Sequence, residues 1–196
     1  MIIGLTGGIA SGKSLVADEL SRRGAALVDA DQVSREVTGP GSPVLGQLVE
    51  AFGPDILQSD GQLDRKGLAG RVFGDPQALE RLNQITHPAI WKEIHHQLGE
   101  HSRTHPVVVL VAPLLLEHGG ERYVDQVWVV HVRPEVQLER LMRRDGLSAQ
   151  QAEARRSAQM SAGERLQRAD VVIDNSGSPE ETVRQIESTW LQRVEA

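Results

Sequence analysis

The chain has 196 residues, enough for one α/β core with an insertion but too few for two full domains. Its 21 Lys and Arg against 27 Asp and Glu give a net charge of −6, so no overall basic field draws it to nucleic acid or anionic membrane. It has no cysteine, which excludes disulfides and thiolate catalysis. No apolar run approaches the roughly 18 residues of a membrane span and no basic region precedes the first strand, so we expect a soluble cytoplasmic protein.

The N-terminal stretch carries the strongest motif in the chain. Residues 7–14, Gly-Gly-Ile-Ala-Ser-Gly-Lys-Ser, fit the phosphate-binding loop pattern G-x-x-x-x-G-K-[ST]. The apolar run 1–6 precedes them and a helical pattern follows from Ser14 to Arg23, so strand, loop and helix come in the required order. Glycines let successive backbone N–H groups turn toward a phosphate at the positive end of the helix. Lys13 would then reach the β- and γ-phosphates, and the Ser14 hydroxyl would coordinate Mg²⁺.

A second apolar run, residues 25–29, predicts a strand that ends at Asp29, and Asp31 follows closely. Open α/β sheets place ligands at strand ends, so Asp31 is a candidate to hold Mg²⁺ or to accept a proton from a substrate hydroxyl. Both aspartates could instead begin a turn and cap the next helix, an interpretation that is stronger for Asp29 than for Asp31.

Residues 32 to about 105 have a helical pattern and are too many for one crossover connection. Helix starts are indicated at Ser42-Pro43, Asp64, Asp75-Pro76 and His87-Pro88. We therefore expect a helical subdomain between strands two and three that forms one wall of a substrate site. Its apolar surface would come from Leu68, Val72, Leu79 and Leu82.

Four histidines lie near the end of this region: His95, His96, His101 and His105. His101 and His105 are one helical turn apart, which suits a pair of metal ligands. No acid or cysteine completes a ligand set, so we expect an exposed helix end instead.

Three further strands and a last helix are predicted in the second half of the chain. Residues 107–112 and 126–132 are continuous apolar runs that indicate buried parallel strands, and residues 169–175 indicate a fifth strand. The final helix begins after Ser178-Pro179 and is expected to pack into the core through Val183, Ile186, Trp190 and Leu191.

An arginine-rich helical hairpin is predicted between the fourth and fifth strands. One face of its first helix carries Arg140, Arg143 and Arg144, opposite the apolar Leu138, Leu141 and Met142. Gly146 ends this helix, and a capping box of Ser148 and Gln151 begins a second one that carries Arg155 and Arg156.

The phosphate-binding loop alone leaves kinase, GTPase and mechanical ATPase open. A guanine-specific GTPase would carry Asn-Lys-x-Asp after a late strand, which this chain lacks, and its D-x-x-G match at 64–67 follows no strand. A small-molecule kinase needs a triphosphate cradle, a carboxylate, an acceptor subdomain and mobile cations, and all four have candidates here. The arginine hairpin would be the lid, although arginines on a helix face can also be a solvated surface.

These residues resemble the dephospho-coenzyme A kinase family, which phosphorylates the ribose 3′-hydroxyl of dephospho-CoA. The similarity covers nearly the whole chain through I-G-L-T-G-G-I-A-S-G-K-S at 3–14, D-A-D-Q-V at 29–33, G-x-L-D-R at 61–65, H-P at 87–88, P-L-L-L-E at 113–117, R-R-D-G-L-S at 143–148 and A-D-V-V-I-D-N-S-G at 169–177. It implies an α/β fold: a P-loop kinase core with a five-stranded parallel sheet flanked by helices, a helical substrate-binding insertion and a small helical lid. The implied parts are the nucleotide-binding core (1–31, 106–136 and 168–196), the acceptor subdomain (32–105) and the lid (137–167).

The resemblance also implies residue roles. The catalytic residues would be Asp31 as general base, Lys13 and Arg140. ATP would be bound by Gly8, Ile9, Ala10, Ser11, Gly12, Lys13, Ser14, Leu15, Arg140 and Asn175. The acceptor would be bound by Arg65, His87, Pro113, Leu116, Glu117 and Arg155. Mg²⁺ would be held by Ser14 and Asp31, and the implied partners are ATP and dephospho-CoA, with no nucleic acid, membrane or obligate protein partner.

Two positions depart from the family pattern. Many members place an Asp two residues before the proline of P-L-L-x-E, whereas this chain has Val111 there and Ala112 after it, which leaves Asp31 and Glu117 as carboxylates for the metal. Arg156 stands where an apolar residue is more usual. Two other functions stay open: another P-loop kinase, such as a nucleoside monophosphate kinase, and a nucleotide-dependent switch that transfers no phosphate.

Overall fold

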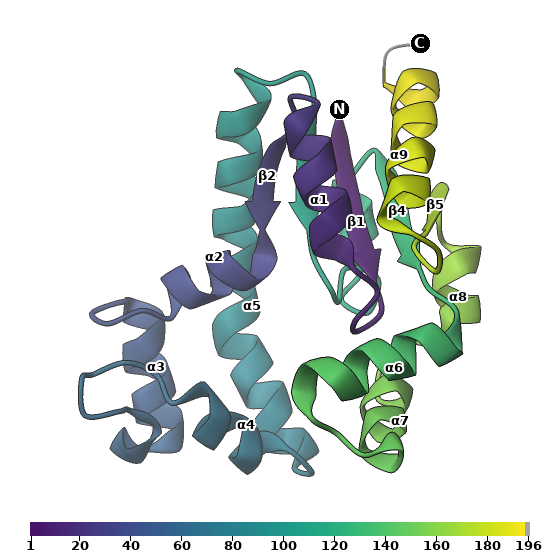
Figure 1. The fold of residues 1–196 in the computed structure, drawn as a ribbon. Coiled ribbons are helices and arrows are strands. Elements are labelled where there is room, and N and C mark those ends of the chain that lie inside the picture. Colours follow the sequence, from purple (N-terminus) through teal and green to yellow (C-terminus); the bar gives the residue numbers. More distant parts are fainter. Residues whose placement is uncertain (195–196) are drawn as a thin grey trace. The chain divides into compact units, whose positions relative to one another are not determined.

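The computed structural model describes residues 1–194 and divides into two compact units (Figure 1). One unit combines Met1–Val28 with the chain from Glu100 onward and contains the sheet. The other unit, Asp29–Gly99, is helical.

Five strands form one parallel sheet: β1 (Ile2–Gly7), β2 (Ala26–Asp29), β3 (Val108–Val111), β4 (Gln126–His131) and β5 (Val171–Asp174), in the spatial order β2-β3-β1-β4-β5. The central strand is β1, in which Ile3 pairs with Val109 of β3 and with Gln126 of β4. The predicted sheet is confirmed, and its central strand leads directly into the phosphate-binding loop.

The core of the sheet unit includes the side chains of Leu5, Leu20, Trp128 and Ile186, all fully buried. They come from the sheet and from helices α1 (Lys13–Arg22) and α9 (Pro179–Arg193), which contact each other. Burial of each large apolar side chain contributes about 2 kcal/mol. The prediction for Leu191 was wrong: it is 52% exposed, because its position lies about 100° further round the helix than that of the buried Trp190.

Three helices lie between β4 and β5: α6 (Pro134–Asp145), α7 (Ala149–Ser157) and α8 (Ala162–Gln167). Gly146 ends α6 in the left-handed conformation, and the predicted capping box of Ser148 and Gln151 begins α7. The arginine-rich hairpin is thus present. The third helix was not predicted, although Ser161 and Glu164 form a second capping box at its start.

The helical unit contains α2 (Ala30–Val37), α3 (Pro43–Phe52), the 3₁₀ helix η1 (Pro54–Ile56), α4 (Arg65–Val72) and most of α5 (Pro76–Ser102). Ser42 and Asp64 cap α3 and α4 as predicted, and the Asp64 carboxylate accepts a 2.9 Å hydrogen bond from the Gly67 N–H. The D-x-x-G match at 64–67 is therefore a helix cap. Leu68 and Val72 are 3% and 6% exposed and lie in this unit's own core, so they do not form the expected apolar substrate wall.

The predicted helix start at His87-Pro88 was wrong, because α5 continues through Pro88. Proline in a helix interior removes one backbone hydrogen bond and crowds the preceding turn. The Thr86 hydroxyl donates a 2.9 Å hydrogen bond to the Leu82 carbonyl in that turn, and the buried Ile94 and Leu98 pack on the C-terminal side of the proline. Packing on both sides of Pro88 outweighs the local signal for a break.

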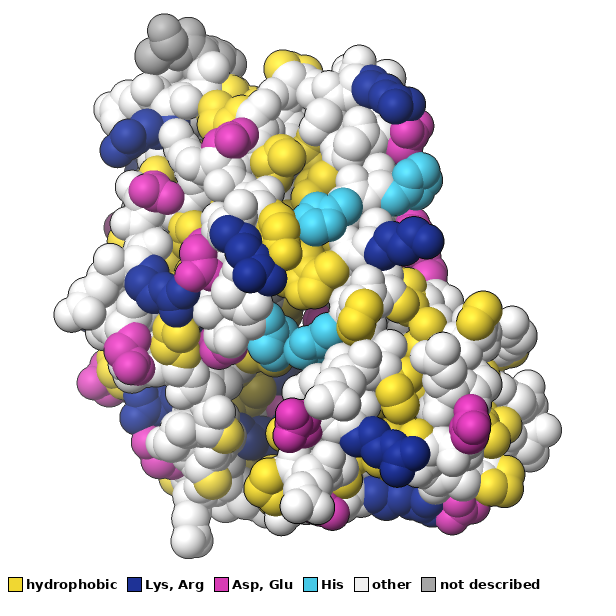
Figure 2. Space-filling view, turned by 180° about the vertical axis from the view of Figure 1, so that it is seen from behind, with side chains coloured by type: hydrophobic (Ala, Val, Ile, Leu, Met, Phe, Trp, Pro, Cys, Tyr) yellow, Lys and Arg dark blue, Asp and Glu magenta, His cyan; other side chains and the backbone are white. Residues whose placement is uncertain are grey.

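Surface charge is mixed. On the face that Figure 2 shows, Lys and Arg side chains are interspersed with Asp and Glu, and no basic patch dominates it. None of the helices in residues 1–194 is both long enough and apolar enough to span a bilayer.

Candidate active site

The phosphate-binding loop follows β1 and leads into α1, whose N-cap is Gly12. Gly12 has φ +87°, and a Cβ at this position would overlap the Asn175 side-chain amide, so both its backbone conformation and the close contact require glycine. Ala10 has φ +58°, the one positive φ of a non-glycine residue within residues 1–194. This left-handed conformation costs about 1–2 kcal/mol, so surrounding contacts must hold it.

Lys13 begins α1 and turns back over the loop. Its ammonium donates hydrogen bonds to the carbonyl oxygens of Gly7 (2.8 Å) and Gly8 (3.3 Å). Ser14, the next residue, is exposed in the first turn of the helix. The predicted ammonium, hydroxyl and helix N-terminus thus occur together around one loop, as anion binding requires.

The side chain of Asn175, the residue after β5, hydrogen-bonds to the backbone of this loop. Its amide nitrogen donates a 2.7 Å hydrogen bond to the Ser11 carbonyl, and its amide oxygen accepts a 2.9 Å hydrogen bond from the Thr182 hydroxyl of α9. Asn175 is 4% exposed. The structure therefore places it against the loop backbone, and its predicted contact with ATP stays a prediction.

Two glutamines of the lid segment bind Ile9 at the tip of the loop. The Gln137 amide of α6 donates a 2.7 Å hydrogen bond to the Ile9 carbonyl, and the Ile9 N–H donates a 2.7 Å hydrogen bond to the Gln159 side-chain oxygen. Arg140, one turn beyond Gln137, also approaches the loop: a Cβ on Gly12 would lie 3.8 Å from its guanidinium. The predicted arginine lid and the phosphate-binding loop are thus neighbours, although neither glutamine was predicted.

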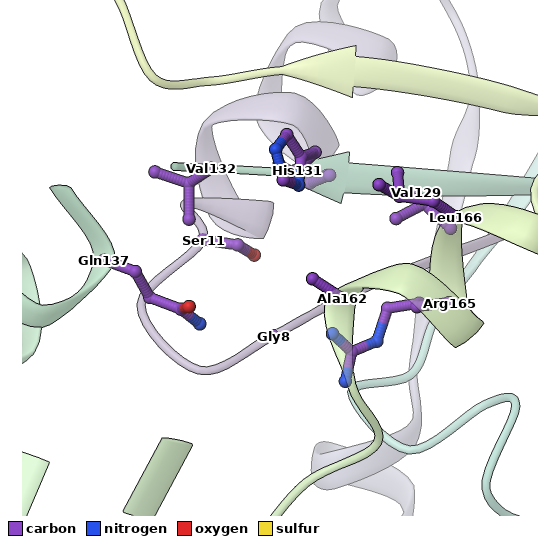
Figure 3. A pocket seen from close by; sticks show the side chains of 10 residues that line it. Gly8, Ser11, Val129, His131, Val132, Gln137, Ala162, Arg165 and Leu166 are labelled. Carbon is purple, nitrogen blue, oxygen red and sulfur yellow. The ribbon is translucent and has the colours of Figure 1, made fainter. Parts of the chain in front are cut away.

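A small pocket beside the loop contains a buried cation (Figure 3). Arg165 of α8 is 5% exposed and donates hydrogen bonds to the Met160 carbonyl (2.9 Å) and to the Glu117 carboxylate (3.4 Å). A Cβ on Gly8 would lie 3.4 Å from the Arg165 guanidinium. Sequence reasoning missed Arg165, because its helix was not predicted and its inward orientation depends on packing.

Three buried polar atoms in this region accept or donate no hydrogen bond within the described part of the chain: Ser11 Oγ, Arg165 Nε and Glu117 Oε2. Buried polar groups in folded proteins are nearly always paired, so such a cluster next to an anion-binding loop marks a place for ligand or ordered water. Glu117, predicted to face the acceptor, forms an ion pair with Arg165, which lines this pocket.

Two other residues predicted to bind the acceptor, Leu116 and Pro113, form contacts within the protein. Leu116 is 2% exposed and its carbonyl accepts a hydrogen bond from Arg168, so its side chain packs inside the protein, and its predicted contact with the substrate stays a prediction. The Pro113 carbonyl accepts a 3.2 Å hydrogen bond from the Thr6 hydroxyl at the end of β1. Val111, where many family members carry Asp, is half-buried and packs on the core.

Arg155 of the lid segment pairs with an acid on the same hairpin. Its guanidinium lies 2.8 Å from Asp145, which also pairs with Arg144. Hydrogen bonding from Arg144 first, and then the charges of Arg144 and Arg155, lower the pKa of the Asp145 carboxyl. Arg155 is thus held on the hairpin, and its predicted contact with the acceptor stays a prediction.

The helical unit contains the remaining predicted residues. Asp29 caps α2 by accepting hydrogen bonds from the N–H groups of Asp31 and Gln32, whereas Asp31 itself is exposed in the first turn.

Arg65 donates a 2.6 Å hydrogen bond to the Thr38 hydroxyl. Burial and the charge of Arg35 lower the pKa of Arg65, and the charge of Asp31 opposes them. Asp31 and Arg65 therefore belong to one charged cluster, joined by Arg35, which was not predicted. His87 lies inside α5, half-buried.

Comparisons with known proteins identify the relatives of this chain. The family model described as dephospho-CoA kinase matches residues 1–181. The dephospho-CoA kinase of Geobacter sulfurreducens is 51% identical over 193 residues, which are 98% of each chain. The crystal structure of TT1252 from Thermus thermophilus is 34% identical, with a TM-score of 0.87 over 99% of this chain and 97% of that one. The dephospho-CoA kinase structure from Campylobacter jejuni is 25% identical, with a TM-score of 0.68 over 100% of this chain and 98% of that one.

Proposed function

The chain belongs to the dephospho-CoA kinase family, which catalyses the final step of coenzyme A biosynthesis with ATP, and we propose how its residues divide that reaction. The γ-phosphoryl group of ATP is transferred to the ribose 3′-hydroxyl of dephospho-CoA. One observation carries this proposal: a complete phosphate-binding loop ends the central strand of a chain that the family model matches from residue 1 to residue 181.

ATP binds with its phosphates over the loop of residues 8–15. The first turn of α1 has N–H groups without partners inside the helix, and these groups and the helix dipole attract the anion. Lys13, now bonded to the Gly7 and Gly8 carbonyls, exchanges those partners for β- and γ-phosphate oxygens. Arg140, near Gly12, supplies a second cation, and its planar guanidinium can bind two phosphate oxygens at once.

Residues of the helical unit are proposed to bind the acceptor. The loop of residues 113–117 is proposed separately, from the family pattern, as a second source of acceptor contacts. Arg65 and Arg35 would attract the diphosphate of dephospho-CoA. Burial is the main cause that lowers the pKa of Arg65, and the positive charge of Arg35 adds to it. Asp31 lies in the same charged cluster and is exposed, as a residue that meets a substrate hydroxyl must be. The roles of His87 and Arg155 in acceptor binding belong to the same proposal.

Phosphoryl transfer then proceeds in one balanced step. Asp31 accepts the proton of the ribose 3′-hydroxyl, and the oxygen of that hydroxyl forms a bond to the γ-phosphorus. The bond from that phosphorus to the bridging oxygen breaks, and ADP leaves. Lys13 and Arg140 stabilise the negative charge that spreads over the γ-phosphate oxygens.

The oxygen atoms around the loop suit Mg²⁺. Ser14 offers an exposed hydroxyl at the start of α1, and Glu117 Oε2 is buried without a hydrogen-bond partner in the described chain. Mg²⁺ prefers oxygen ligands and retains several waters, so few protein ligands are needed. Ser14 and Asp31 would hold the ion, which when bound neutralises charge on the β- and γ-phosphate oxygens.

An acceptor panel tests the proposal. With Mg-ATP, the protein should phosphorylate dephospho-CoA and barely use AMP, CMP or UMP, because remote contacts to the long pantetheine arm help to position the hydroxyl. Mass spectrometry and phosphorus NMR identify the product and the position of the new phosphate. Preferential phosphorylation of a nucleoside monophosphate would indicate the alternative kinase, and ATP binding without transfer to any acceptor would indicate the switch.

A further inference from the structure

Both backbone polar groups of Ile9, at the tip of the phosphate-binding loop, form hydrogen bonds with the same helical hairpin. Gln137 lies in the first turns of α6 and Gln159 lies just after α7, so the two contacts come from opposite ends of the hairpin. Both hydrogen bonds are 2.7 Å, and Gln137 is 8% exposed. Figure 3 shows the Gln137 side chain directed toward the loop that carries Gly8 and Ser11.

Because the peptide unit is planar, these contacts also fix the orientation of the Ala10 N–H group. The Ile9 carbonyl and the Ala10 N–H belong to one trans peptide unit and point in opposite directions. A Gln137 amide that holds this carbonyl therefore directs the Ala10 N–H to the other side of the loop. Ala10 itself has φ +58°, a conformation that alanine does not keep without such restraint.

We propose that Gln137 and Gln159 are positioning residues that hold the phosphate-binding loop in its nucleotide-receiving shape and thereby couple the α6–α7 hairpin to ATP binding. Neither side chain needs to touch the reacting atoms. Gln137 orients the peptide between Ile9 and Ala10, and Gln159 orients the preceding one. This inference rests on the proposed function, since the loop must bind ATP for its shape to matter.

The polarity of the two contacts allows a charge-matched experiment. Gln137 acts as donor, so Gln137→Glu removes the hydrogen bond and sets a carboxylate against a carbonyl oxygen. Gln159 acts as acceptor, so Gln159→Glu keeps an acceptor for the Ile9 N–H. Both variants add one negative charge beside the same residue, and they differ in whether the bond survives. Gln137→Leu and Gln159→Leu remove each bond without charge, and Gln192→Glu on the exposed face of α9 controls for net charge.

We expect Gln137→Glu, Gln137→Leu and Gln159→Leu to raise the Kd for Mg-ATP about tenfold, the effect of one lost hydrogen bond. Gln159→Glu should weaken ATP binding clearly less than Gln137→Glu. The KM for dephospho-CoA should stay near that of the wild type in all four, while kcat falls in the three variants that lose the bond. Isothermal titration calorimetry and steady-state kinetics measure these values, and circular dichroism at the assay temperature verifies folding.

Several results would overturn the inference. Equal losses in Gln137→Glu and Gln159→Glu would attribute the effect to charge alone. Lower melting temperatures with unchanged ATP affinity would make both contacts merely structural, and tighter ATP binding by Gln159→Leu would mean that Gln159 competes with phosphate. If the wild-type protein binds ATP and the Leu variants match it, this inference fails alone; if the wild type binds no ATP, the proposed function fails with it.

Discussion

The Asn175 amide donates a 2.7 Å hydrogen bond to the Ser11 carbonyl, although the two residues are 164 positions apart. Both are buried, and the Thr182 hydroxyl fixes the orientation of the amide through its other end. The bond joins the end of β5 to the phosphate-binding loop after β1, across the intervening strand β4. The loop is therefore supported by the C-terminal part of the chain as well as by its own glycines.

Replacement of Asn175 by Leu should destabilise the protein and weaken ATP binding together. The Ser11 carbonyl and the Thr182 hydroxyl would each lose a buried partner, at a combined cost of about 1–3 kcal/mol. Thermal melting and ATP titration check both effects. Thr182→Val is the matched control, since it keeps the bond between Asn175 and Ser11 and should disturb ATP binding less. An Asn175→Leu variant with wild-type melting and affinity would contradict this role.

The Lys13→Ala variant should lose transfer by several orders of magnitude and still fold. The lysine ammonium binds two loop carbonyls and supports no apolar core, so its removal chiefly deletes the cation that meets the transferring phosphate. An activity assay measures the loss of phosphoryl transfer, and a melting curve shows whether the variant still folds. Unfolding of the variant, or near-normal turnover, would show that this loop does not act as proposed.

Asp31→Asn should keep ATP binding but lose turnover about 10²–10⁴-fold, because the amide cannot accept the hydroxyl proton. The comparison of kcat with the Kd for ATP is the measurement. Asp29→Asn is a useful companion: an Asn cap can still accept the hydrogen bonds from Asp31 and Gln32, so activity should survive. Losses of the same size in affinity and turnover of Asp31→Asn would make Asp31 a binding residue.

Substitutions of Glu117 and Arg165 should have non-additive effects on stability. Their effect on phosphoryl transfer should be separable from their effect on stability. Glu117→Gln leaves the buried Arg165 guanidinium without its partner, which typically costs about 3–5 kcal/mol. Arg165→Met leaves the Glu117 carboxylate unpaired and should cost less, because that side chain is 19% exposed. The double variant Glu117→Gln with Arg165→Met should regain much of that stability, as measured by a double-mutant cycle in urea. It should not regain transfer, because the guanidinium beside Gly8 would still be absent. Additive losses in the cycle would contradict the coupling.

Local sequence signals predicted most elements of this fold. Caps at Ser42, Asp64 and Ser148 and the apolar runs of five strands act over a few residues, so they can be read without knowledge of the rest of the chain. Pro88 shows the limit of such signals. Its local preference for a helix start is overridden by buried side chains on both sides of it in α5.

The sequence by itself determined where the phosphate-binding loop lies, because its glycines, Lys13 and Ser14 are contiguous and their chemistry depends on backbone geometry that the loop generates locally. The tertiary structure alone decided which polar side chains support that loop. Gln137, Gln159, Arg165 and Asn175 come from distant elements, and their orientation depends on how the helices pack beside the sheet. A hydrogen bond requires a separation of about 3 Å and a favourable angle, and only the folded chain brings these groups that close.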